Sequence, residues 1–205
     1  MHAAALLLLA ASPVLAPTHV SAGSTAQKVA PMDDQRFWSI VEQSGVNAQG
    51  QEQQEANLRR ALAALPVTDP VAWQMAYDAK RAAAYSWDLW GAAYIIHGGV
   101  SDDGFDYFRN WLIARGRRVY EAALADPDSL AGTISAGMNE VAEFEGFGYV
   151  AMELWAKRTG RNRAQMPSGA TQPAKPTGEP WKEDDSILAA RYPKLWKRFG
   201  SKPLE

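Results

Sequence analysis

The residue types that can do chemistry crowd together between positions 87 and 118, where acidic, basic, aromatic and glycine residues alternate. Asp102, Asp106 and Arg109 follow one another at spacings of four and three, which places two carboxylates and a guanidinium on one helix face. Asp103 stands beside them. Carboxylate oxygens suit Mg²⁺, Mn²⁺ or Ca²⁺, and a neighbouring arginine can hold an anionic substrate. One hypothesis is therefore a divalent-metal site formed by Asp102, Asp103 and Asp106.

A structural interpretation of the same residues competes with the metal site. Acids in the first turn of a helix stabilise the helix dipole, and Asp106 with Arg109 is an ordinary ion pair at helical spacing. The chain has neither an EF-hand loop nor a His-Glu-x-x-His motif. We therefore expect no cofactor, and a divalent metal is the one alternative.

His97 is the only histidine after the first 31 residues, so any imidazole proton shuttle depends on it. A triad of Ser101, His97 and Asp102 can be written down, but the sequence lacks a nucleophile elbow and triads are defined by geometry. Gly98 and Gly99 follow directly and predict a helix end, where a histidine suits the dipole. No catalytic residue is assigned.

The alternative to a metal or catalytic site at residues 87–118 is a binding surface. It would consist of partly exposed aromatic, acidic and basic side chains and would meet a protein partner or a small polar ligand. The candidate ligand-binding residues are Trp90, Tyr94, His97, Asp102, Asp106 and Arg109. Arg81, Tyr85 and Asp88 form a further helical stripe, which we expect to meet these charges in a buried polar network. This network either specifies the fold or forms the floor of a pocket.

Composition limits the function classes. The chain has 205 residues, 47% of them hydrophobic, a formal charge of -2 and no cysteine. The absence of a basic excess argues against nucleic acid as a partner. Without cysteine there is no disulfide, thiolate nucleophile or cysteine-ligated metal.

The first 31 residues differ from the rest in composition and allow two interpretations. The apolar run of residues 3–11, with a small-residue site at 20–22, fits a secretory signal. Alternatively Met32 is the true start and the upstream residues come from a start codon assigned too early. The second interpretation predicts a cytoplasmic protein, and the first predicts a secreted one. The apolar run is too short to span a membrane.

Helical periodicity recurs from residue 33 onwards, and no strand alternation is found. Capping and breaking residues predict the helix limits: Gly45, Pro66, Asp69-Pro70, Gly98-Gly99, Ser101, Gly116 and Asp126-Pro127. The pattern predicts one long helix from about Val71 to His97 and another from Asn139 to Lys157, kinked at Gly146 and Gly148. The fold class is therefore all-α, a compact single domain of several helices.

The C-terminal part divides further. Residues 160–180 are rich in Gly, Pro, Ser and Thr and predict a flexible linker between a helical core at 32–159 and an arm at 181–205. In the arm, Asp184-Asp185 predicts a helix cap, and Leu195, Trp196 and Phe199 form an apolar hook. We expect this arm to pack back on the core.

Several motifs resemble a family of bacterial proteins catalogued as domain of unknown function 4240. The residues that carry the resemblance are Leu89-Trp90-Gly91-Ala92-Ala93-Tyr94, Gly98-Gly99, the run from Ser101 to Arg109, Trp111-Leu112-Ile113, Phe37-Trp38, Gly116-Arg117, Tyr120-Glu121, the run from Asp126 to Leu130, and the run from Tyr192 to Trp196. The resemblance covers residues 32 to about 199, which favours Met32 as the start. It implies a grouping and no activity. We therefore expect a protein- or small-ligand-binding module, with a metal-assisted hydrolase or nuclease as the alternative.

Overall fold

The computed structural model describes residues 29–134 and 141–204 of the chain. Over these ranges it contains α-helices, three short 3₁₀ helices and no β-strand, which confirms the all-α prediction. The α-helices are α1 (Asp34–Gly45), α2 (Gln51–Ala63), α3 (Asp69–Ala83), α4 (Trp87–His97), α5 (Asp102–Ala114), α6 (Arg117–Ala125), α7 (Val150–Thr159), α8 (Asp185–Arg191) and α9 (Pro193–Phe199). The 3₁₀ helices are η1 (Pro127–Gly132), η2 (Gly146–Gly148) and η3 (Arg163–Gln165). The leader predicted for residues 1–31 falls, up to residue 28, outside the described residues.

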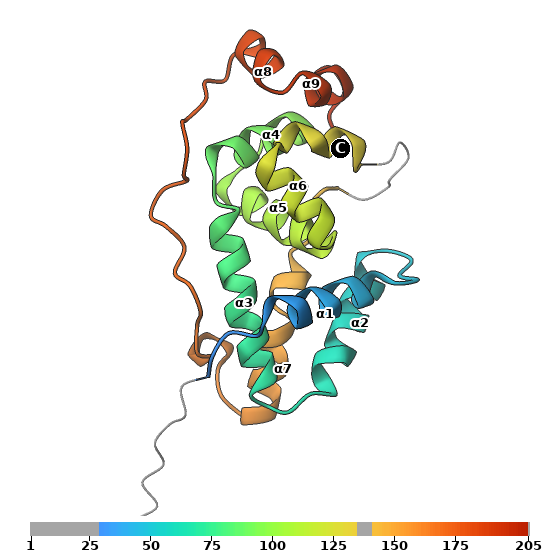
Figure 1. Cartoon of the computed structure of the whole chain (residues 1–205), viewed down its shortest axis with the longest axis vertical. Helices are drawn as coiled ribbons and strands as arrows, with labels where there is room; N and C mark the ends of the chain where they lie inside the picture. Colours follow the sequence, from blue (N-terminus) through green and yellow to red (C-terminus); the bar gives the residue numbers. More distant parts are fainter. Residues whose placement is uncertain (1–28, 135–140, 205) are drawn as a thin grey trace, which may run out of the picture.

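The helices form two groups around one continuous core. Figure 1 shows α1, α2, α3 and α7 in the lower half of the view, α4, α5 and α6 in the upper half, and α8 and α9 at the top. One hydrophobic cluster of buried side chains runs through both groups and includes Phe37, Trp73, Phe108 and Trp111. In the described part of the chain, no helix is long and apolar enough to cross a membrane.

The prediction of one long helix over residues 71–97 is wrong, because the helix is interrupted between Ala83 and Trp87. Ser86 adopts an extended conformation (φ -134°, ψ 151°), and its hydroxyl accepts the backbone N–H of Leu89 at 3.2 Å. Ser86 is therefore an N-cap, and the continuous apolar periodicity on either side of it hid this signal. This interruption separates α3 from α4. It leaves the Tyr85 carbonyl and the Trp87 N–H available for hydrogen bonds with another segment.

The helix predicted for residues 139–157 is also shorter than expected. Residues 139 and 140 lie outside the described ranges, and α7 begins only at Val150. A Cβ atom at Gly148 would lie 2.9 Å from Asn110 Nδ2 and 3.3 Å from the Tyr77 hydroxyl oxygen. Tyr77 in turn donates a hydrogen bond of 2.6 Å to Asn110 Oδ1. Gly148 therefore permits a close approach of this segment to α3 and α5.

Residues 160–180, which we call the strap, follow α7 and run along one side of the molecule past α3 to α8 (Figure 1). Specific contacts hold the strap to the core. Gly169 N–H donates to Asp78 Oδ2 at 3.1 Å. Thr177 N–H donates to the Tyr85 carbonyl, and the Trp87 N–H donates to the Thr177 carbonyl, both at 2.9 Å. The strap thus pairs with the backbone exposed at the α3–α4 break.

Residues 181–204, the described part of the arm, pack back on the core as expected. Leu195 and Phe199 of α9 are buried, as are Leu188 and Tyr192. The Asp128 carboxylate accepts the backbone N–H groups of Lys194 at 3.1 Å and Leu195 at 2.8 Å, so it caps the start of α9.

Candidate functional site

The turn between α4 and α5 positions the predicted site. Gly98 ends α4 in the left-handed conformation (φ 66°), which a side chain would make unfavourable. Ser101 then caps α5, its hydroxyl accepting the Gly104 N–H at 3.2 Å. Asp102 and Asp103 consequently lie in the first turn of α5 with exposed side chains.

The structure does not gather the predicted metal ligands. The Asp106 carboxylate, 40% exposed, points to two arginines: its Oδ2 lies 2.9 Å from an Arg81 guanidinium nitrogen, and its Oδ1 accepts a hydrogen bond from Arg109. In residues 29–134 and 141–204, no group of three His, Asp or Glu side chains is arranged to hold a metal ion. The metal site at Asp102, Asp103 and Asp106 stays a prediction.

Arg109 is the least exposed residue of the candidate site, with 0% of its surface accessible. Its Nη1 donates to the Arg81 carbonyl at 2.8 Å, and its Nη2 donates to Asp106 and, at 2.8 Å, to Gln172 Oε1. Burial lowers the pKa of Arg109, and the Asp106 charge opposes that shift. We call Arg81, Asp106 and Arg109 the arginine cluster. It joins α3 to α5.

Two neighbouring aromatic rings contact the Arg109 guanidinium. Its central carbon lies 4.8 Å from the ring centre of Tyr85 and 5.1 Å from that of Phe105. Such cation–π contacts hold the guanidinium plane in a fixed orientation. The network expected between Arg81, Tyr85 and the charges of α5 is therefore present, with Arg109 as its centre.

Asp88 does not join the polar network that was predicted for Arg81, Tyr85 and Asp88. It forms an ion pair with Arg191 of the arm, and its carbonyl accepts the Tyr192 hydroxyl at 2.9 Å. Burial raises the pKa of Tyr192 to about 12, so this hydroxyl remains a donor at neutral pH. Asp88 therefore fastens the arm instead of joining the arginine cluster.

Gln172 is a residue of the candidate site that the sequence analysis did not identify. It lies in the strap, in a segment of low complexity, and no spacing or motif marks it. It could be found only once the fold had placed the strap against α3.

His97 ends α4 and packs edge-on against Phe108, with ring centres 6.3 Å apart. Burial lowers the pKa of His97, and a hydrogen bond to the backbone of Ala142 opposes the shift. The Ser101 hydroxyl is used in capping α5. The arrangement supports a structural role for His97 at a helix end.

Four partly exposed rings form a continuous row over α4 and the start of the arm. Trp87 stacks on Trp90 (5.4 Å, 17°) and meets Trp181 edge-on (6.5 Å, 86°), while Tyr94 packs against Trp181 at 4.8 Å. The Trp181 indole N–H donates to the Trp87 carbonyl at 2.9 Å. We call these four residues the aromatic surface. Two of them, Trp90 and Tyr94, were predicted ligand-binding residues.

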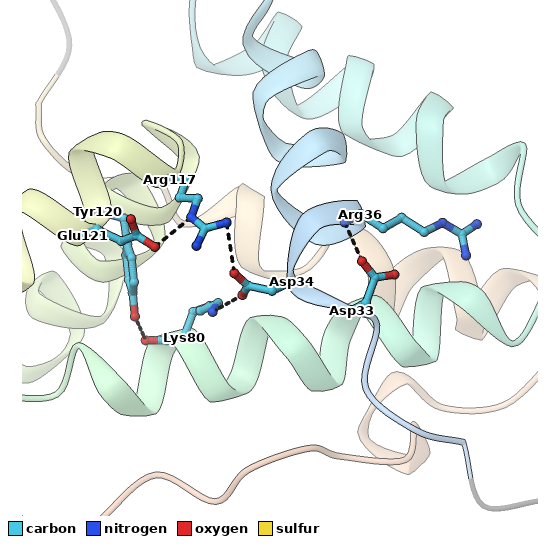
Figure 2. Close-up of polar contacts among 7 residues, drawn as sticks. All are labelled: Asp33, Asp34, Arg36, Lys80, Arg117, Tyr120 and Glu121. Carbon is cyan, nitrogen blue, oxygen red and sulfur yellow. Dashed lines mark hydrogen bonds and ion pairs between the residues drawn. The ribbon is translucent and has the colours of Figure 1, made fainter.

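A second polar cluster, not foreseen from the sequence, joins α1, α3 and α6 (Figure 2). Asp34 lies between Lys80 and Arg117, which is 3.5 Å from it. Arg117 also pairs with Glu121 at 2.7 Å, and Tyr120 donates to the Lys80 carbonyl at 2.9 Å. Asp34, Arg117 and Glu121 are each about half exposed, so these contacts orient helices without enclosing a site.

Together, the fold and site define an all-α domain whose arginine cluster is covered by the chain's own strap. The family described as "Protein of unknown function (DUF4240)" matches residues 32–157, and the chain belongs to this family. The matched range runs from the segment before α1 into α7, so the strap and the arm lie outside it. Comparisons with curated proteins and with solved structures gave no match.

Proposed function

We propose that the protein is a binding module and that the aromatic surface is where it meets a basic segment of a partner protein. The observation that supports this is the row of Trp87, Trp90, Tyr94 and Trp181, whose rings contact one another and remain partly exposed. Tryptophan and tyrosine dominate the energetic centres of protein interfaces because they bury a large area at small conformational cost. No catalytic role is assigned to this surface.

The charges around the aromatic surface favour a cationic partner. Residues 87–94 and 178–191 carry five acids and two bases. Burial raises the pKa of Tyr94, and the neighbouring Glu183, which accepts a hydrogen bond from it, raises it further. One of the two bases, Arg191, is already paired with Asp88. Acidic groups beside exposed indole rings are the combination that attracts lysine and arginine side chains.

The test uses a fluorescent octalysine peptide, with octaglutamate as the anionic control, and measures anisotropy at physiological salt. We expect saturable binding of octalysine only. Trp87→Ala should weaken it by about tenfold or more, as expected for a central interface residue. Glu183→Gln should weaken binding, because it removes a rim charge.

The matched control is Glu52→Gln, which makes the same charge change at an exposed residue of α2. It should leave binding unchanged. If Glu52→Gln weakens octalysine binding as much as Glu183→Gln, the attraction is a property of net charge and the proposal is wrong. Binding that survives Trp87→Ala unchanged would also overturn it.

A further inference from the structure

The arginine cluster leaves buried hydrogen-bond donors without acceptors. A guanidinium has five N–H groups. The contacts of Arg109 use three of them, on the Arg81 carbonyl, Asp106 and Gln172, and its Nε has no partner. The buried Nε of Arg81 has no partner either. Because buried polar groups almost always find a partner, two unfilled donors in one cluster indicate that a further acceptor would be stabilised there.

The Gln172 contact differs in kind from the other two. Asp106 and the Arg81 carbonyl belong to helices, whereas Gln172 belongs to the strap, where residues 171–175 are all exposed. Its carboxamide oxygen is a neutral acceptor, and a guanidinium binds an ionised oxygen more strongly. Lifting this part of the strap costs few apolar contacts. Gln172 can therefore be displaced by a better acceptor.

We propose that Arg81 and Arg109 form a binding site for a small oxyanion, a carboxylate or a phosphate, and that Gln172 occupies this site when no ligand is present. The Tyr85 and Phe105 rings fix the guanidinium plane, so that its edge is presented to the position of Gln172 Oε1. An oxyanion at that position has several oxygens, so it can accept from Nη2 and also from a donor that is now unfilled.

The charges facing the cluster limit the affinity of this site. Asp106 neutralises one guanidinium. Asp78 lies one turn before Arg81 and accepts from Gln74 and from the strap residue Gly169. The charges of the two arginines and the two aspartates therefore sum to zero. A bound anion is stabilised by the fixed geometry of the N–H groups rather than by net positive charge. This favours a small ligand whose two oxygens can engage the guanidinium edge.

The probes are inorganic phosphate and succinate, measured by calorimetric titration and by thermal shift. Gln172→Ala removes the competing acceptor, and we expect it to bind at least one probe about tenfold more tightly than the wild type, the value of one charge-assisted hydrogen bond. Gln172→Glu supplies a tethered carboxylate, so it should raise Tm without ligand and abolish binding. Thr171→Ala, a change at the exposed neighbouring residue, is the matched control and should resemble the wild type.

Two results would overturn the proposal. The first is that the Gln172→Ala variant binds both probes no more tightly than the Thr171→Ala variant does. In that case water is the acceptor for the unfilled donors. The second is unchanged affinity after Arg81→Gln is added to Gln172→Ala, which would place the anion elsewhere. Circular dichroism establishes that each variant is folded, Arg81→Gln included, since the Arg81 side chain is only 27% exposed. The octalysine assay measures binding of a cationic peptide and the titrations measure binding of a small anion, so either proposal can fail while the other holds.

Discussion

At the scale of single residues, burial decides which charged groups are available for chemistry. Arg109 is fully buried, whereas Asp102 and Asp103, seven and six residues earlier, are exposed. The sequence predicted the Asp106–Arg109 pair, because their spacing of three places them on one helix face. It could not predict that the Arg109 guanidinium would also contact the Tyr85 ring, because Tyr85 is brought there by the turn at Ser86.

His97 provides a pH-dependent prediction at this scale. Burial lowers its pKa in the folded state, so the unfolded chain, with a pKa near 6.5, takes up the proton first as the pH falls. The stability contributed by neutral His97 is therefore complete above about pH 7 and is lost as the pH falls through 6.5 towards the lower folded pKa. Urea unfolding at pH 7.5 and 5.5 should show a larger loss for the wild type than for His97→Gln. Equal losses would contradict the prediction.

The metal hypothesis makes the second prediction at this scale. Both Asp106 oxygens face arginines, and Asp102 and Asp103 are exposed acids of a helix start. Calorimetric titration with Mg²⁺, Mn²⁺ and Ca²⁺ should therefore show no saturable binding, and Asp102→Ala combined with Asp106→Ala should titrate identically. Saturable binding by the wild type that disappears in the double variant would contradict this prediction and favour the metal-assisted hydrolase or nuclease.

At the scale of elements, the sequence predicted helix limits well wherever a glycine, proline or capping residue marked them. Gly45, Ser101 and Gly116 each stand at a helix end or cap, as expected. The break at Ser86 was missed because its flanking residues keep a helical apolar period, and the pairing with Thr177 that accompanies it comes from a segment 91 residues away. Long-range backbone pairing leaves no local signal in the sequence.

The packing of the arm on α4 predicts a severe effect of a small change. A Cβ atom at Gly91 would lie 2.5 Å from the Tyr192 hydroxyl oxygen, 2.9 Å from its Cζ and 3.0 Å from Trp181 Nε1. Gly91→Ala should therefore lower the free energy of unfolding by about 1–3 kcal/mol through overpacking. Chemical denaturation measures this, and Gly132→Ala is the control because no atom lies within 4 Å of its added Cβ.

A double-mutant cycle identifies the contact responsible. Tyr192→Phe removes the atom nearest to the new Cβ, so Gly91→Ala should cost less in that background than in the wild type. Strictly additive effects would show that the cost of Gly91→Ala arises inside α4 and not from the arm.

At the scale of the whole molecule, the strap and arm connect regions that the helical core leaves separate. The strap contacts α3 and the α3–α4 break, and the arm closes over α4 and η1. Both proposed binding surfaces involve these C-terminal residues, since Trp181 completes the aromatic surface and Gln172 occupies the anion site when no ligand is present. The C-terminal part is thus an integral portion of the domain.

The final prediction follows from the burial of the arm. Leu188, Tyr192, Leu195 and Phe199 are each at most 4% exposed. Burying one such side chain is worth about 1.5–3 kcal/mol, against which the arm must lose conformational entropy on docking. Deletion of residues 181–205 should therefore lower Tm by several degrees and reduce the urea m-value, because the truncated chain buries less surface. Leu195→Ala in the full chain should cost about 2–5 kcal/mol through the cavity it leaves. An unchanged Tm in both variants would show that the arm does not contribute to the core in solution.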